Sequence, residues 1–113
     1  MKYLLVAVNA KYIHSNPAIY LIKQYSNCNN VEICEYTINN STHEILRDII
    51  LRKPKIVAFS CYIWNITIIK ELAKSISIIN PDIDIFLGGP EVSYNPLEVI
   101  KELPFIKGVM IGE

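Results

Sequence analysis

Residues 83–91 read IDIFLGGPE, and the interpretation of the whole chain starts from this stretch. A run rich in apolar residues stops abruptly at Gly88, Gly89 and Pro90, which is typical of a buried strand followed by a tight turn. Glycines at the exit of a strand also allow the backbone to approach a ligand without interposed side chains. The turn alone indicates either a plain structural turn or a binding loop. The residues of the neighbouring loops distinguish these two interpretations.

Strand-like and helix-like segments alternate on both sides of this stretch. Residues 2–8 form a continuous apolar run, as expected of a strand covered on both faces, and residues 31–38 alternate as in a strand covered on one side. Residues 55–60 and 107–111 supply two further strands. Together with the opening stretch, the sequence therefore predicts five strands.

Helix signals separate these strands. Four helices begin at Asn16-Pro17, at the capping box Ser41-Thr42-His43-Glu44, at Asn65 as an N-cap, and at Asn95-Pro96. Helical spacing predicts that the following side chains face inward: Ala18, Leu21, Ile22 and Tyr25; Ile45, Leu46, Ile49 and Ile50; Ile68, Ile69, Leu72, Ala73, Ile76 and Ile79; and Leu97, Ile100 and Leu103.

Five strands alternating with four helices predict an α/β chain with a parallel sheet. Right-handed crossovers and a length of 113 residues favour a flavodoxin-like, doubly wound, Rossmann-like three-layer fold with strand order 2-1-3-4-5. We expect residues 1–113 to form one domain. Because no closing helix follows the fifth strand, we expect a fragment of a longer protein; packing of that strand against a partner is the alternative.

Composition narrows the function classes. The formal net charge is zero and the isoelectric point is about 6.7, so binding to nucleic acid or to an anionic membrane has no electrostatic support. The apolar start of the chain is too short for a membrane span. Three cysteines, an odd number without metal-binding spacing, favour a reducing cytoplasm.

Polar and aromatic residues gather in the loops that follow three of the strands. These loops are residues 9–15 (NAKYIHS), 60–65 (SCYIWN) and 88–94 (GGPEVSY), whereas the turns at the opposite edge are short or simply polar. Ligands of doubly wound sheets bind above the carboxyl ends of the strands. The asymmetry therefore predicts a binding face at this edge.

Several doubly wound families are excluded by the same loops. Residues 9–15 contain no glycine, so neither a dinucleotide fingerprint nor a phosphate-binding P-loop is present. Asn9 and Ser60 stand where a phosphorylated receiver domain needs acidic residues, and residues 11–13 do not resemble the phosphate loop of a flavodoxin.

One family matches these loops. Residues 9–16, 59–65 and 88–91, with Gly112-Glu113 at the end, resemble the N-terminal cobalamin-binding domain of radical S-adenosylmethionine proteins. The resemblance covers essentially the whole chain. It implies that cobalamin lies on the carboxyl edge, that a downstream radical domain is the partner, and that S-adenosylmethionine and a 4Fe-4S cluster bind only in that missing domain.

The resemblance also implies roles for individual residues. The glycine pair would let the backbone pass the nucleotide tail, Ser60 would bond the tail, and aromatic residues would cover the corrin. The predicted cofactor-binding residues are Asn9, Lys11, Tyr12, Ser60, Tyr62, Trp64, Gly88, Gly89, Pro90 and Glu91. Trp64 has the alternative of anchoring the third helix, and Cys61 is expected to be a small buried hydrophobe.

The chain departs from the family pattern at the cobalt ligand. Cobalamin modules with a histidine ligand carry Asp-x-His-x-x-Gly after the first strand, where this chain has Asn9, Lys11 and His14. Base-off cobalamin without a histidine ligand, and no metal ligand from this chain, is therefore expected. The domain alone would not be catalytic, whereas the full protein would be a radical methyltransferase or oxidoreductase. A degenerate domain without cofactor, with a structural or docking role, and a stand-alone flavodoxin-like protein remain alternatives.

Overall fold

The computed structural model describes residues 2–10, 31–93 and 95–110. Within these ranges the strands are β1 (Tyr3–Asn9), β2 (Val31–Thr37), β3 (Ile56–Ser60), β4 (Asp84–Gly88) and β5 (Gly108–Met110). The helices are α2 (Thr42–Leu51), α3 (Ile66–Ile79), α4 (Pro90–Ser93) and α5 (Pro96–Glu102). The helix predicted from Asn16-Pro17 lies outside the described residues.

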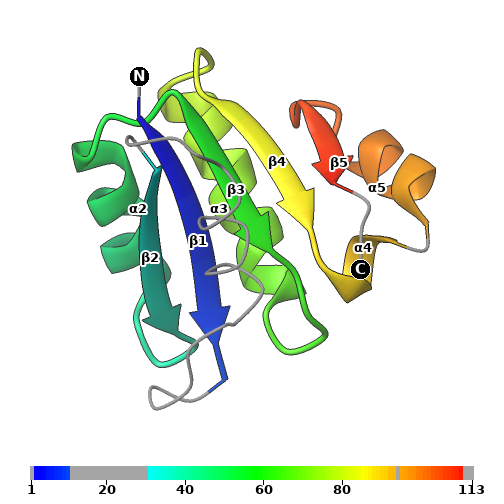
Figure 1. The fold of residues 1–113 in the computed structure, drawn as a ribbon, viewed down its shortest axis with the longest axis horizontal. Helices are drawn as coiled ribbons and strands as arrows, with labels where there is room; N and C mark the ends of the chain where they lie inside the picture. Colours follow the sequence, from blue (N-terminus) through cyan, green and yellow to red (C-terminus); the bar gives the residue numbers. More distant parts are fainter. Residues whose placement is uncertain (1, 11–30, 94, 111–113) are drawn as a thin grey trace.

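The five strands form one parallel sheet in the order β2-β1-β3-β4-β5 (Figure 1). This confirms the predicted flavodoxin-like α/β fold. The order reverses direction between β1 and β3, because β2 lies on one side of β1 and all later strands lie on the other. That reversal is where doubly wound sheets bind their ligands.

The main core lies between one face of the sheet and the described helices. It combines Val6 of β1 and Phe59 of β3 with Ile49 of α2 and Leu72 of α3, all of them at most 1% exposed. Alternate residues of the strands face the other side, where Leu5, Ala7, Val31 and Ala58 form a second cluster. Burial on both faces explains why β1 and β3 read as continuous apolar runs.

Helix α2 begins as its sequence predicts. The Glu44 backbone N–H donates to Ser41 Oγ at 3.1 Å, and the Ser41 backbone N–H donates to Glu44 Oε1 at 3.2 Å. These reciprocal bonds satisfy backbone donors that the first helical turn leaves without partners. The capping box is therefore confirmed.

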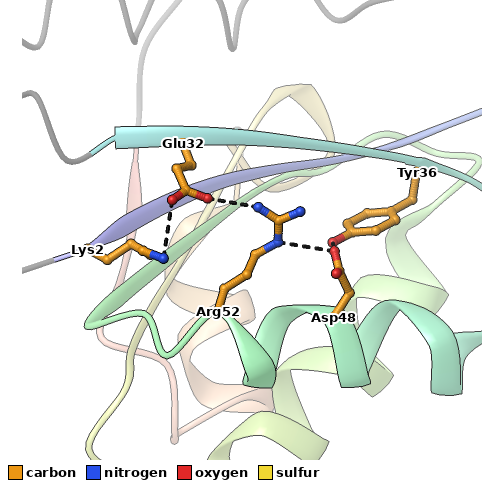
Figure 2. A network of polar contacts seen from close by, with 5 residues as sticks. All are labelled: Lys2, Glu32, Tyr36, Asp48 and Arg52. Carbon is orange, nitrogen blue, oxygen red and sulfur yellow. Dashed lines mark hydrogen bonds and ion pairs between the residues drawn. The ribbon is translucent and has the colours of Figure 1, made fainter.

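Polar side chains attach α2 to the edge strand β2 (Figure 2). Glu32 of β2 accepts from Lys2 Nζ at 3.2 Å and from Arg52 Nη1 at 2.8 Å, and Arg52 Nε also pairs with Asp48 at 3.2 Å. The Tyr36 hydroxyl donates to the same Asp48 carboxylate. The network thus ties the start of the chain, β2 and the C-terminal half of α2 together.

Three predicted core positions are wrong. Leu97 and Ile100 are 72% and 39% exposed on α5, and Ile79 is 53% exposed at the end of α3. Helix α5 is only seven residues long, and Leu103 directly after it supplies the buried contact instead. Ile79 is the last residue of its helix, where the apolar stripe has run past the core. Helix α4 was not predicted, and no described helix is long and apolar enough to cross a membrane.

Candidate functional site

The carboxyl ends of three neighbouring strands are in register. Ser60 of β3 pairs with Ala7 of β1 on one side and with Gly88 of β4 on the other, and Gly88 pairs with Met110 of β5. Strand β1 continues two residues further, to Asn9, where it pairs only with β2. The sheet therefore ends in a step between β1 and β3, at the reversal of strand order.

The chain segments that leave β3 and β4 are bonded to each other. The Cys61 N–H donates to the Gly88 carbonyl at 2.7 Å, and the Cys61 carbonyl accepts from the Glu91 N–H at 3.3 Å. Ser93 Oγ donates to the Gly89 carbonyl at 2.6 Å, inside the short helix α4 that Pro90 opens. These bonds hold the glycine turn against the end of β3.

Gly89 is required by this internal packing. Its φ of +100° is a conformation that side chains disfavour, and a Cβ at this position would lie 2.6 Å from the Cys61 carbonyl oxygen. A Cβ on Gly88 would meet Met110, and its nearest neighbour, at 3.1 Å, is the Cε at the flexible end of that side chain. The close approach that Gly89 allows is thus to the backbone of Cys61, so the glycine is explained without a ligand.

An aromatic pair follows β3. The rings of Tyr62 and Trp64 stack with centroids 4.5 Å apart and planes 5° from parallel. Trp64 remains 46% exposed, and its Nε1 donates to the Val8 carbonyl at 3.3 Å. This pair is a flat apolar surface fixed beside the carboxyl end of β1.

Asn65 is the N-cap residue of α3, as predicted, but its side chain makes no capping hydrogen bond to the helix. Instead Nδ2 donates to the carbonyls of Val8 and Ser60 at 2.9 Å and 3.1 Å, and Oδ1 accepts from the Tyr62 N–H at 2.8 Å. The side chain cannot reach the helix as well, because its amide is engaged across the step in the sheet. Sequence reasoning missed this role, since an asparagine before a helix normally indicates a cap.

The structure brings most predicted site residues to one edge. Ser60, Tyr62, Trp64, Gly88, Gly89, Pro90 and Glu91 occupy the ends of β3 and β4 and the segments that follow. Asn9 lies at the same edge but on the β2 side, where its carbonyl accepts from the Ile38 N–H at 2.9 Å. Lys11, Tyr12, His14 and Gly112-Glu113 lie outside the described residues. Met110 and Ile63, 38% and 77% exposed, were missed at this edge.

Comparison with known proteins shows the family of this chain. A family model described as the B12 binding domain matches residues 3–113. The chain belongs to the B12-binding domain family. No curated protein gives a significant match to this B12-binding domain. Family membership makes cobalamin its ligand class, whereas the predicted link to a radical domain goes beyond what the match covers.

A solved structure has the same fold. The crystal structure of a novel cobalamin-binding protein from Desulfitobacterium hafniense DCB-2 superposes with a TM-score of 0.68 at 14% sequence identity. The match covers 96% of this B12-binding domain and 52% of the solved chain, so this chain spans about half the length of that protein. At this identity the likeness establishes the shared fold.

The residues of this domain fit a cobalamin. The corrin is a broad ring system, and the carboxyl edge offers the Tyr62–Trp64 stack, with exposed Trp64, and Ile63 and Met110 as further apolar groups. Ser60 and Glu91 place polar groups at the same edge. Among the described residues, no group of histidine, cysteine or carboxylate side chains is arranged to hold a metal ion.

The cysteine that follows β3 is shielded from solvent. Cys61 is fully buried, and burial raises the pKa of its thiol to about 12, so it stays protonated at neutral pH. Its Sγ lies 3.9 Å from the Phe59 carbonyl. The prediction of a small buried hydrophobe is confirmed.

Proposed function

We propose that this chain is the cobalamin-binding module of a larger radical S-adenosylmethionine protein and holds base-off cobalamin across the carboxyl edge of its sheet. The observation that carries the proposal is the Tyr62–Trp64 stack with its exposed Trp64 ring, which lies at the reversal of strand order in a member of the B12-binding family. A flat aromatic surface at that place suits a flat macrocycle.

Apolar and polar binding residues would contact different parts of the cobalamin. Tyr62 and Trp64 would support the corrin ring, and Ser60 and Glu91 would bond polar groups of the nucleotide tail. The turn Gly88-Gly89-Pro90 would present its backbone along that tail, and Asn9, Lys11 and Tyr12 would contribute from the loop after β1. Bound cobalamin supplies cobalt-centred methyl or electron transfer, while this chain binds and orients it.

The wider assignment extends the proposal beyond the domain. The resemblance through Gly112-Glu113 supports a downstream radical domain, which would hold S-adenosylmethionine and a 4Fe-4S cluster and act as methyltransferase or oxidoreductase. The buried, unpaired Cys34 and Cys61 support a reducing cytoplasm. Neutral net charge gives no support to nucleic-acid or membrane partners.

Titration of the purified chain with hydroxocobalamin tests the binding proposal. We expect a change in the absorption spectrum and retention of cobalamin on desalting. Trp64→Ala should weaken binding by about tenfold, because loss of one aromatic contact costs roughly 1–1.5 kcal/mol. Ile78→Ala, which truncates a 72%-exposed apolar side chain of α3, is the matched control and should leave affinity unchanged.

Two outcomes would contradict this proposal. Absence of both the spectral change and the retention would contradict cobalamin binding. Equal affinity for cobinamide, which lacks the nucleotide tail, would contradict the proposed contacts of Ser60 and the glycine turn with that tail.

A degenerate domain without cofactor is the second candidate. One observation favours it: Gly89 is fully explained by the backbone of Cys61, so the glycine turn does not require a ligand. In that case the chain would fold and leave cobalamin unbound, and its role would be structural or in docking.

A further inference from the structure

The step between β1 and β3 leaves one strand carbonyl without a strand partner. The last β1–β3 pair is Ala7 with Ser60. The next backbone amide that would face β1 is the Tyr62 N–H, and it donates to Asn65 Oδ1 at 2.8 Å instead. The Val8 carbonyl, next in β1, therefore receives no backbone N–H from β3. A buried carbonyl in this situation needs another donor.

Side chains from the β3–α3 loop supply that donor. Asn65 Nδ2 donates to the Val8 carbonyl at 2.9 Å, and Trp64 Nε1 donates to the same oxygen at 3.3 Å. The Asn65 amide thus replaces a peptide group of the missing ladder. It does so across 57 residues of sequence, at the place where the strand order reverses.

The remaining atoms of the Asn65 amide hold the loop itself. Its Nδ2 also donates to the Ser60 carbonyl at 3.1 Å, and its Oδ1 accepts from the Tyr62 N–H at 2.8 Å. The residue is 1% exposed and is the only buried polar or charged residue among those the structure describes. Its two donors and its acceptor are all engaged, so its orientation is determined by the end of β1 and by residues 60–62.

We infer that Asn65 is a positioning residue that fixes the Tyr62–Trp64 stack as a rigid platform for a flat ring ligand. The amide bonds the backbone of Tyr62 and shares the Val8 carbonyl with Trp64, so both members of the stack are held through it. A surface ordered before binding loses less conformational entropy when the ligand arrives. The identity of that ligand rests on the proposed function, whereas the positioning of the stack does not.

The chemistry of asparagine suits this role better than that of similar residues. An aspartate would set a carboxylate against two carbonyl oxygens, and a serine has one donor for the two carbonyls. An alanine would leave the Val8 carbonyl to Trp64 alone and the Tyr62 N–H without its acceptor.

Trp64 provides a direct readout, because it is the only tryptophan in the chain. In the ligand-free protein, Asn65→Ala should raise the acrylamide quenching constant of Trp64 about twofold, since the ring loses its fixed neighbour. The control is Ile76→Val, which shortens a fully buried side chain of α3, the helix that follows Asn65, and should also lower the melting temperature. The quenching constant of Trp64 should be unchanged in this control. An increase seen only in Asn65→Ala therefore does not come from a general loss of stability.

The ligand measurement uses hydroxocobalamin on the same proteins. Asn65→Ala should weaken binding by about five- to fiftyfold, Asn65→Ser by less, and Ile76→Val by less than about twofold. Unchanged quenching, unchanged affinity in Asn65→Ala, or an equal effect of Ile76→Val would each overturn the inference. If the unaltered chain binds no cobalamin, the proposed function fails, and the quenching comparison alone then decides whether Asn65 positions the stack.

A measurement on the unaltered chain covers the case in which no Asn65 variant folds. The Asn65 side-chain amide protons and the Tyr62 backbone amide should exchange slowly with solvent by NMR, because both are hydrogen-bonded in the structure. Rapid exchange at both positions would overturn the inference.

Discussion

At the scale of single residues, the edge of the sheet depends on one glycine and one asparagine. Both are required by contacts within the protein itself. Gly89 adopts a φ of +100° so that its backbone can pass Cys61, and Asn65 bonds a carbonyl that β3 leaves unpaired. Residue types that suggest a ligand or a helix cap are here needed to complete the loops. The ligand would then meet a surface that these contacts have already shaped.

Gly89→Ala should therefore destabilise the fold strongly. The added Cβ would lie 2.6 Å from the Cys61 carbonyl oxygen in a backbone conformation that disfavours side chains, and we expect a loss of about 2–4 kcal/mol. Denaturant unfolding measures this loss.

Gly108→Ala is the matched control, because its Cβ would make only ordinary contact with Phe86 at 3.5 Å. Equal stabilities of the two variants would contradict the packing argument for Gly89.

At the scale of elements, the polar network in Figure 2 joins the edge strand β2 to α2. Hydrogen bonds from Lys2 and then Arg52 hold the pKa of Glu32 below its usual range, and the hydrogen bond from Tyr36 does the same for the pKa of Asp48. Burial, with the Asp48 bond, raises the pKa of Tyr36, so its hydroxyl stays a donor. The two carboxylates therefore stabilise the fold only in their charged form.

This network predicts a loss of stability in acid. Because both carboxyl pKa values are lower in the folded chain, the unfolded chain takes up protons first as the pH falls, and stability declines from about pH 5 toward about pH 3. These side chains are partly exposed, so Asp48→Asn should cost less than about 1 kcal/mol at pH 7 and progressively less as the pH falls through the lowered pKa of Asp48.

Unfolding curves across this pH range check the prediction. Asp82→Asn, at an exposed aspartate outside the network, should leave the pH dependence as it is. A pH-independent cost of Asp48→Asn would show that its charge is not the stabilising feature.

At the scale of the whole molecule, β2 and the β3 end belong to one core although they lie on opposite sides of β1. Cys34 of β2 and Cys61 after β3 are 4% and 0% exposed in the same apolar cluster, which also includes residues of α2 and α3. Burial raises the pKa of both thiols. Shared packing predicts that both positions become accessible in one cooperative transition.

Thiol labelling tests this cooperativity in a Cys28→Ser background, which removes the cysteine outside the described residues. Neither remaining cysteine should react in native buffer, and both should react at the denaturant midpoint seen by circular dichroism. Labelling of Cys34 at clearly lower denaturant would show that the edge strand opens by itself.

Much of the architecture could be predicted because its signals are local. Strand runs, the Ser41–Glu44 capping box and the alternation of elements each depend on residues within a few positions of one another, and the structure confirms them. The parallel order β2-β1-β3-β4-β5 follows from that alternation and from right-handed crossovers. The same reasoning places the loops after β1, β3 and β4 at one edge.

The remainder depends on contacts between distant residues. Helical spacing marked Leu97 and Ile79 as buried, but exposure depends on where α5 and α3 end relative to the core. Asn65 and Val8 are 57 positions apart, and no local pattern joins them. The sequence by itself thus determined the order of elements and the edge at which the segments after β3 and β4 lie. Only tertiary structure decided which side chains build that edge. Because β3 ends two residues before β1, the last residues of β1 take hydrogen-bond partners from residues that are distant in sequence, such as Asn65.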